Sequence, residues 1–153
     1  RPAQGRVLVL SNGNFGERTQ ELVRRFAAEV TVVSAPWGQR WSVDSARAEL
    51  EKGDVVAVCA VHNETSAGVA NDLGALAPAV RRSGALFLVD GISSLAGLPL
   101  PIESWGIDAV VAGSQKGSAL RRASRWSTSQ NGPSQPSIRD RTTSTSAPTS
   151  SRS

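Results

Sequence analysis

The fold is decided by residues 55–90, VVAVCAVHNETSAGVANDLGALAPAVRRSGALFLVD. This stretch opens and closes with apolar runs, Val55–Val61 and Ala85–Val89, of the kind that forms buried strands. Between them, residues Asn71–Ser83 have a helical pattern, and Gly84 follows as a helix terminator. A strand, a helix and a second strand in this order predict two parallel strands joined by a crossover helix.

The same alternation extends along the chain on both sides. Further strands are predicted at Val7–Leu10, Val30–Val33 and Ala109–Ala112, and further helices at Glu17–Ala28 and Asp44–Lys52. Pro78 predicts a kink or a break within the helix at 71–83, because proline lacks the backbone N–H. The whole pattern predicts an α/β fold, a mostly parallel and doubly wound sheet with helices on both faces.

Length and composition set the class of protein. The chain has 153 residues, about one domain, and 39% of them are hydrophobic. No apolar run approaches the roughly 20 residues of a membrane helix, so we expect no membrane partner and a cytoplasmic location. A single cysteine, Cys59, excludes an internal disulfide and a cysteine-based cluster, and we expect no metal.

Charge divides the chain near residue 117. Residues 1–117 hold 11 basic and 12 acidic residues, a net charge of −1, whereas residues 118–153 hold six arginines and one aspartate, a net charge of +5. The second part is rich in Ser, Thr, Arg and Pro and predicts a disordered tail. An alternative is a basic arm that binds nucleic acid without sequence specificity.

Three loops follow strands at the edge where parallel sheets bind ligands: His62–Gly68, Asp90–Gly97 and Gly113–Gly117. Only two lysines, Lys52 and Lys116, stand beside 15 arginines. An amine kept at a strand end favours chemistry that arginine cannot do, of which imine formation is the leading candidate. An ordinary solvated lysine is the alternative.

Asp90 ends an apolar strand, where partial burial would raise its pKa unless a cation lies beside it. His62 is more often a packing or stacking residue than a metal ligand, and Thr65 could donate a hydrogen bond to an anion. Residues 13–16, GNFG, are only a weak match to a dinucleotide-binding loop.

The loops together resemble those of class V aminotransferases, the pyridoxal-phosphate enzymes that include alanine–glyoxylate and serine–glyoxylate aminotransferases. The matching stretches are LVLSNGNFGER (8–18), VHNETSAGV (61–69), LFLVDGISSLAGLPL (86–100) and WGIDAVVAGSQKG (105–117). The resemblance implies that residues 1–117 are a fragment of the family's pyridoxal-phosphate-binding large domain.

By position, the resemblance implies that Lys116 forms the Schiff base with pyridoxal 5'-phosphate and that Asp90 pairs with the pyridine nitrogen. Ile92 would lie against one face of the ring and His62 would stack near the other.

Three more residues follow from the same resemblance. Thr65 would contact the ring hydroxyl or the phosphate, and Ser114 and Gln115 would contact the phosphate.

The implied reaction is amino transfer from alanine or serine to glyoxylate or another 2-oxo acid, by an enzyme that is a homodimer when intact. We expect little or no activity from this fragment. A lyase or desulfurase of the same fold, and a non-catalytic Rossmann-like module with a basic tail, are the alternatives.

The tail departs from the family, which continues after the lysine with an APPG-containing apolar segment. With GC-rich codons, reading residues 118–132 from the third base of the Ser118 codon gives G-A-P-P-G-L-S-V-V-D-V-S-E-R. This reading is the basis of a hypothesis that residues 118–153 are a frameshifted translation.

Overall fold

The computed structural model describes residues 3–117 and 125–129. The strands are β1 (Ala3–Ser11), β2 (Ala27–Ser34), β3 (Val55–Val61), β4 (Asn63–Glu64), β5 (Val69–Ala70), β6 (Leu86–Asp90), β7 (Ala109–Gly113) and β8 (Arg125–Ser129). The helices are α1 (Asn14–Arg24), α2 (Val43–Glu51), α3 (Leu73–Ser83) and α4 (Ile102–Trp105).

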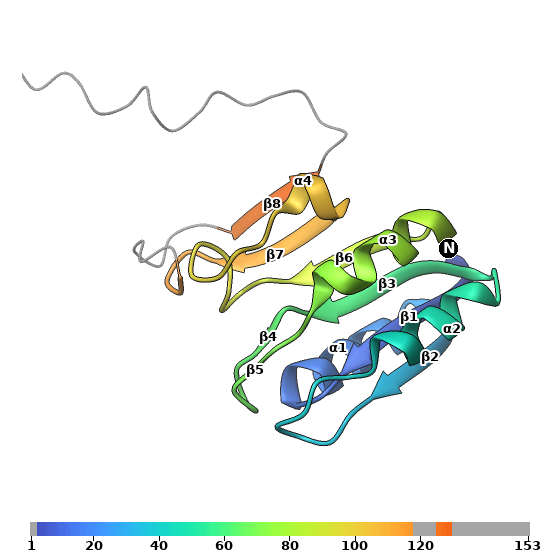
Figure 1. Ribbon diagram of the computed structural model, residues 1–153, viewed down its shortest axis with the longest axis horizontal. Coiled ribbons are helices and arrows are strands. Elements are labelled where there is room, and N and C mark those ends of the chain that lie inside the picture. Colours follow the sequence, from blue (N-terminus) through green and yellow to red (C-terminus); the bar gives the residue numbers. More distant parts are fainter. Residues whose placement is uncertain (1–2, 118–124, 130–153) are drawn as a thin grey trace, which may run out of the picture.

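Six strands form one sheet in the order β2-β1-β3-β6-β7-β8 (Figure 1). The first five run parallel, and β8 pairs antiparallel with β7. The chain first adds β2 on one side of β1 and then returns to add β3 on the other, so the sheet changes its direction of growth between β1 and β3. The predicted α/β fold with a mostly parallel sheet is confirmed.

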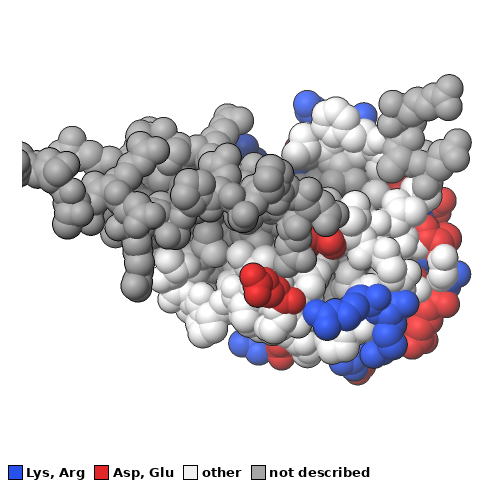
Figure 2. All heavy atoms as spheres, turned by 90° about the horizontal axis from the view of Figure 1, so that it is seen from above, with Lys and Arg blue, Asp and Glu red and all other residues white. Residues whose placement is uncertain are grey.

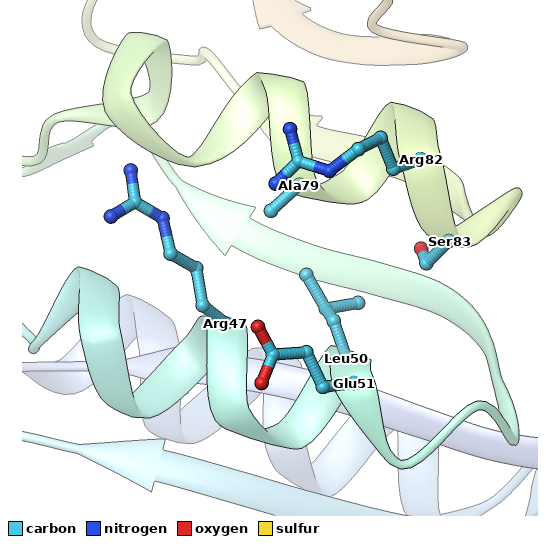
Figure 3. Close-up of a pocket in the computed structure, with 6 residues that line it drawn as sticks. All are labelled: Arg47, Leu50, Glu51, Ala79, Arg82 and Ser83. Carbon is cyan, nitrogen blue, oxygen red and sulfur yellow. The ribbon is translucent and has the colours of Figure 1, made fainter.

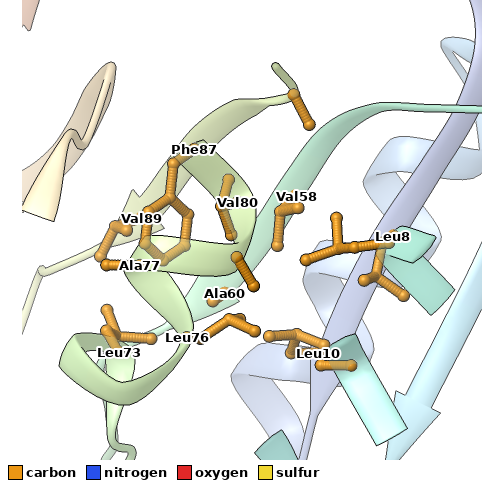
Figure 4. Close-up of a cluster of buried hydrophobic side chains, with 14 of the residues drawn as sticks. Leu8, Leu10, Val58, Ala60, Leu73, Leu76, Ala77, Val80, Phe87 and Val89 are labelled. Atoms are coloured by element: carbon orange, nitrogen blue, oxygen red, sulfur yellow. The ribbon is translucent and has the colours of Figure 1, made fainter. Parts of the chain in front are cut away.

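Helices cover both faces of this sheet. The larger core lies under α2, α3 and α4, where Leu8, Val58 and Phe87 have no exposed surface (Figure 4). The smaller core lies under α1, where Val23 packs against Val9 and its neighbours on β1 and β3. Alternate residues of the central strands thus enter different cores, which is why these strands are apolar along their whole length.

Helix α3 runs without a break through Pro78, so the predicted break is wrong, whereas the kink stays a prediction. The N–H that Pro78 lacks would have bonded to the carbonyl of Gly74, so one hydrogen bond is lost. Leu76, Ala77 and Val80 are buried on either side of the proline. Their packing against the sheet holds the helix together across the missing bond.

The predicted disorder of the tail stays a prediction, and the structure describes five of its residues. Arg125–Ser129 form β8, which pairs with all five residues of β7. A strand at a sheet edge presents unpaired N–H and C=O groups that another extended segment can satisfy. The rest of the tail, residues 118–124 and 130–153, lies outside the described residues.

Charge on the described surface is mixed. Figure 2 shows basic side chains beside acidic ones on the face in view. At the start of β1, the buried Arg6 binds Glu49 and Asp54, each through a contact of 2.6 Å. Across residues 3–117 and 125–129, the helices are all too short or too polar to cross a membrane.

Candidate active site

A cavity of about 100 Å³ lies at the carboxyl ends of the parallel strands, among the segments that follow β1, β3, β6 and β7. It includes the place where the sheet changes its direction of growth, which is where open α/β sheets bind ligands. Four of the seven predicted site residues line it together: Thr65, Asp90, Ile92 and Lys116. The other lining residues are Phe15, Val61, Asn63 and Ser93.

Lys116 is presented by a turn directly after β7. Its backbone N–H donates to the carbonyl of Gly113 at 3.0 Å, and its side chain is exposed at the cavity. The next residue, Gly117, packs so closely on the segment after β6 that an added Cβ would overlap the carbonyl oxygen of Leu95. A side chain at 117 would therefore displace the turn that carries the lysine.

Asp90 is the last residue of β6 and is partly buried. Burial raises the pKa of the Asp90 carboxyl, the N–H of Ile92 lowers it by donating to Oδ1 at 2.9 Å, and the charge of Glu64 raises it again. In the described part of the chain, no basic side chain forms an ion pair with Asp90. The cavity thus holds a carboxyl that would be stabilised by a cation.

Hydroxyl groups line the wall of the cavity beside Asp90. The Thr65 hydroxyl donates to Ser93 Oγ at 2.9 Å, and the Asn63 side-chain amide donates to the same oxygen at 3.0 Å. Ser93 Oγ in turn donates to the Asn63 carbonyl at 3.0 Å. These bonds tie the segment after β3 to the segment after β6.

His62 does not line the cavity. Its ring is buried, and Nδ1 lies 2.9 Å from Ser94 Oγ. The ring also makes an edge-on contact with the Trp105 ring, with 6.1 Å between the two ring centroids. Burial lowers the pKa of the imidazole. In an extended segment, successive side chains point to opposite sides, so Val61, Asn63 and Thr65 reach the cavity while His62 faces the other way.

Two other predicted residues also lie off the cavity lining. Ser114 is buried, and Gln115 is exposed with its side-chain amide close to Gly113. Their contact with a phosphate stays a prediction.

Asn63, Ser93 and Phe15 are cavity residues that the sequence reasoning did not select. Asn63 and Ser93 lie inside two of the three nominated loops, and the alternation of side chains along residues 61–65 was a usable signal for Asn63. Phe15 lies in residues 13–16, a weak match to a dinucleotide-binding loop, and in the stretch 8–18 of the class V resemblance, which gives it no role of its own. Its place in the cavity depends on the approach of α1 to β3, for which the sequence has no local signal.

A larger cavity of about 210 Å³ lies elsewhere, between α2 and α3 (Figure 3). It contains no predicted site residue. The Arg47 side chain at this cavity is engaged, because it bonds to Asp44 at 3.2 Å and donates to the Ala75 carbonyl at 2.8 Å. Across the described ranges, no group of three His, Cys, Asp or Glu side chains could hold a metal ion.

Comparison with known proteins identifies the family of this chain. The family model described as aminotransferase class-V matches residues 4–120. A relative named soluble hydrogenase, small subunit, from Synechococcus is 42% identical over 75% of this chain and 31% of its own length. The L-aspartate–glyoxylate aminotransferase of Paracoccus denitrificans is 38% identical over 75% of this chain and 30% of its own length.

The solved structures agree. The alanine–glyoxylate aminotransferase of Nostoc superimposes with a TM-score of 0.78 at 32% identity, over 86% of this chain and 35% of that one. This chain spans about a third of the length of the curated relatives it matches. The match covers every segment of the cavity, from Phe15 to Lys116. The chain therefore belongs to the class V aminotransferase family.

Proposed function

We propose that this chain is the cofactor-binding part of an aminotransferase that uses pyridoxal 5'-phosphate. The reaction is the transfer of an amino group from a small amino acid, alanine or serine, to glyoxylate or another 2-oxo acid. The observation that supports it is the presence of Lys116 and Asp90 in one cavity. An amine can hold an aldehyde covalently, and a buried carboxyl can pair with a protonated ring nitrogen.

The residues present fit this cofactor. Asp90 is a carboxyl with a raised pKa and without a cationic partner in the described residues, which suits a positively charged heteroaromatic ring. Ile92 offers an apolar contact to such a ring, and Thr65 and Ser93 offer hydroxyl groups. The bound cofactor would supply an electron sink for the charge that develops at the α-carbon of the amino acid.

The chain's own residues would then have separate tasks. Asp90 would hold a proton on the ring nitrogen by ion pairing, and Ile92 would orient the ring. The Lys116 Nζ would first hold the cofactor and, once released, would accept and return the proton of the substrate α-carbon. Thr65 would fix the position of the ring through its hydroxyl group.

The acceptor is proposed from the relatives. Glyoxylate stands in the names of the Paracoccus and Nostoc proteins, whose amino donors differ. The donor of this chain, alanine or serine, is the finer part of the proposal.

A desulfurase reaction is disfavoured by the cysteine. Cys59 lies in the middle of β3, and burial raises the pKa of its thiol to about 11. The thiolate, and not the thiol, is the nucleophile of cysteine chemistry. Cys59 is also the only cysteine in the sequence, so this chain would need a sulfur nucleophile from elsewhere.

Two features of the intact protein belong to the same proposal. The full-length protein would be a homodimer, and residues 118–153 would be a displaced reading of the segment that follows the lysine. The chain as it stands would turn over substrate slowly or not at all.

Reductive trapping tests the proposal directly. The purified chain is incubated with pyridoxal phosphate, reduced with borohydride and digested, and the modified lysine is mapped by mass. We expect the adduct on Lys116 and not on Lys52, whose amine is paired with Glu49 at 2.7 Å. Equal labelling of both lysines would contradict the proposal.

Lys116→Arg and Lys52→Arg are the matched variants. Arginine keeps the positive charge but does not form the imine. The first change should remove the adduct and the second should leave it intact.

A further inference from the structure

Glu64 is a buried carboxylate with no task in the proposed reaction. It has no exposed surface, and in the described part of the chain it forms no ion pair with a basic side chain. Its side chain follows the alternation described above and points away from the cavity that its neighbours Asn63 and Thr65 line. A buried charge without a cation must be stabilised by hydrogen bonds or dipoles.

Four donors converge on this carboxylate from two segments. From the first turn of α1, the Phe15 N–H donates to Oε1 at 3.4 Å and the Gly16 N–H donates to Oε2 at 3.0 Å. From the segment after β3, the N–H and the hydroxyl of Ser66 donate to Oε1 at 3.2 and 2.6 Å. The positive end of the α1 dipole adds to these bonds.

The two segments that Glu64 joins each contribute a residue to the cavity lining. Phe15 lies on α1, and Thr65 lies between Glu64 and Ser66. A further bond, from the Asn14 N–H to Ser66 Oγ at 3.0 Å, joins the same two segments.

The glycine of residues 13–16 is part of this arrangement. A Cβ at Gly13 would lie 2.6 Å from Glu64 Cγ and 2.7 Å from Ser66 Oγ. Only a hydrogen atom fits between the start of α1 and the Glu64 side chain. The GNFG motif thus allows α1 to approach Glu64, which accounts for a sequence feature that the cofactor roles left unexplained.

We propose that Glu64 is a positioning residue for the cofactor cavity. By binding the first turn of α1 and the Ser66 segment at once, it sets where Phe15 and Thr65 stand relative to Asp90 and Lys116. The inference rests on the proposed function, since it assigns Glu64 a part in holding the same cofactor. The charge of Glu64 also acts on the site, because it contributes to the raised pKa of Asp90.

Glu64→Gln is the main test, because it preserves shape while removing the charge and one acceptor oxygen. In the cofactor-free chain, we expect amide hydrogen exchange at Phe15, Gly16 and Ser66 to become about tenfold faster. We also expect pyridoxal phosphate to bind about tenfold more weakly, as measured by titration of the 153-residue chain.

Leu50→Ala is the control for general loss of stability. Leu50 is buried on α2 and does not line the cavity. It should lower the melting temperature while leaving the three amides and the cofactor affinity within twofold of wild type. If Glu64→Gln lowered cofactor affinity no more than Leu50→Ala does, the role of Glu64 would be structural only and the inference would be wrong.

Ser66→Ala covers the case in which Glu64→Gln does not fold. It removes one of the four donors and should give a smaller change in the same direction at the same amides. No change in exchange at Phe15 and Gly16 would overturn the inference. Failure of the wild-type chain to bind pyridoxal phosphate would instead overturn the proposed function alone. The exchange measurement is made without cofactor, so it would still decide whether Glu64 holds the first turn of α1 and the Ser66 segment in place.

Discussion

The backbone N–H of His62 donates to the carbonyl oxygen of Asp90 at 2.9 Å, yet only one of the two side chains reaches the cavity. Asp90 lines it, whereas His62 packs against Ser94 and Trp105. The bond continues the pairing of β3 with β6 one residue past the end of β3, to the last residue of β6. The backbone of Asp90 is therefore held by the sheet, and its carboxyl accepts a hydrogen bond from the N–H of Ile92 at 2.9 Å.

Asp90→Asn should stabilise the cofactor-free chain at pH 7. Because burial raises the pKa of Asp90 above its ordinary value of 3.8, the folded chain binds this proton more tightly than the unfolded chain does. Stability therefore falls as the pH rises from that ordinary value through the raised pKa. The melting temperature of the variant should exceed that of wild type at pH 7, and the two should converge at acid pH.

The same variant should bind pyridoxal phosphate more weakly, because asparagine offers no charge to the ring nitrogen. Higher stability together with lower cofactor affinity would mark Asp90 as a functional residue. If Asp90→Asn instead melted at a lower temperature than wild type at pH 7, burial would not be destabilising the charged form of Asp90.

Gly13→Ala should destabilise the chain, whereas Gly97→Ala should not. The added methyl group at 13 would meet Glu64 Cγ at 2.6 Å, but at 97 the nearest atom is the Ser94 carbonyl oxygen at 3.7 Å, an ordinary contact. Overpacking of this kind costs about 1–3 kcal/mol. Urea unfolding of the two variants measures the difference, and equal midpoints would show that the start of α1 can move away from Glu64.

Arg6→Met should lower the melting temperature at pH 7 by about 5–10 °C. Arg6 is buried, and its loss leaves the Asp54 and Glu49 carboxylates without their shared partner. Hydrogen bonding to Arg6 is the main cause that lowers the pKa of Asp54, so the stabilisation is lost as the pH falls through that lowered pKa. The difference from wild type should shrink at acid pH, while Arg40→Met, at an exposed position, should have little effect at any pH.

If residues 118–153 are a frameshifted translation, the DNA that encodes them should show it. The coding DNA should contain the displaced reading G-A-P-P-G-L-S-V-V-D-V-S-E-R after the Gly117 codon. Codons at 118–132 that are incompatible with this reading would rule it out.

A chain in which the displaced reading follows Gly117 should melt at a higher temperature than the 153-residue chain. The reading places Val-Val-Asp-Val over the stretch that forms β8, next to the exposed Val111 on β7. Apolar β-branched residues suit an edge position beside such a neighbour better than Ser and Thr do. A version with the same residues in scrambled order is the control and should show no gain.

The local pattern of the sequence determines the strands, the helices and the loops that follow the strands. Short apolar runs between amphipathic segments are enough to predict strands, helices and a parallel sheet, since each signal lies within about ten residues. The loops that follow the strands could be predicted as ligand-binding loops in the same way. The family resemblance rests in part on the residues around Thr65, Asp90 and Lys116. Helix ends such as Gly84, with a φ of 74°, were equally local.

Which side chains face one another depends on contacts between segments that are distant in the sequence. Glu64 looks like a solvated loop residue in the sequence, and its burial arises because α1 begins where β3 ends, 48 residues apart in the chain at the Gly16 contact. His62 and Asn63 are adjacent in the sequence, and the direction of the extended segment alone sends one to Trp105 and the other to the cavity. The helix also continues through Pro78, because the packing of α3 against the sheet outweighs the one hydrogen bond that the proline removes. Contacts between distant segments depend on how the strands are ordered in the sheet, and no stretch of sequence contains that order by itself.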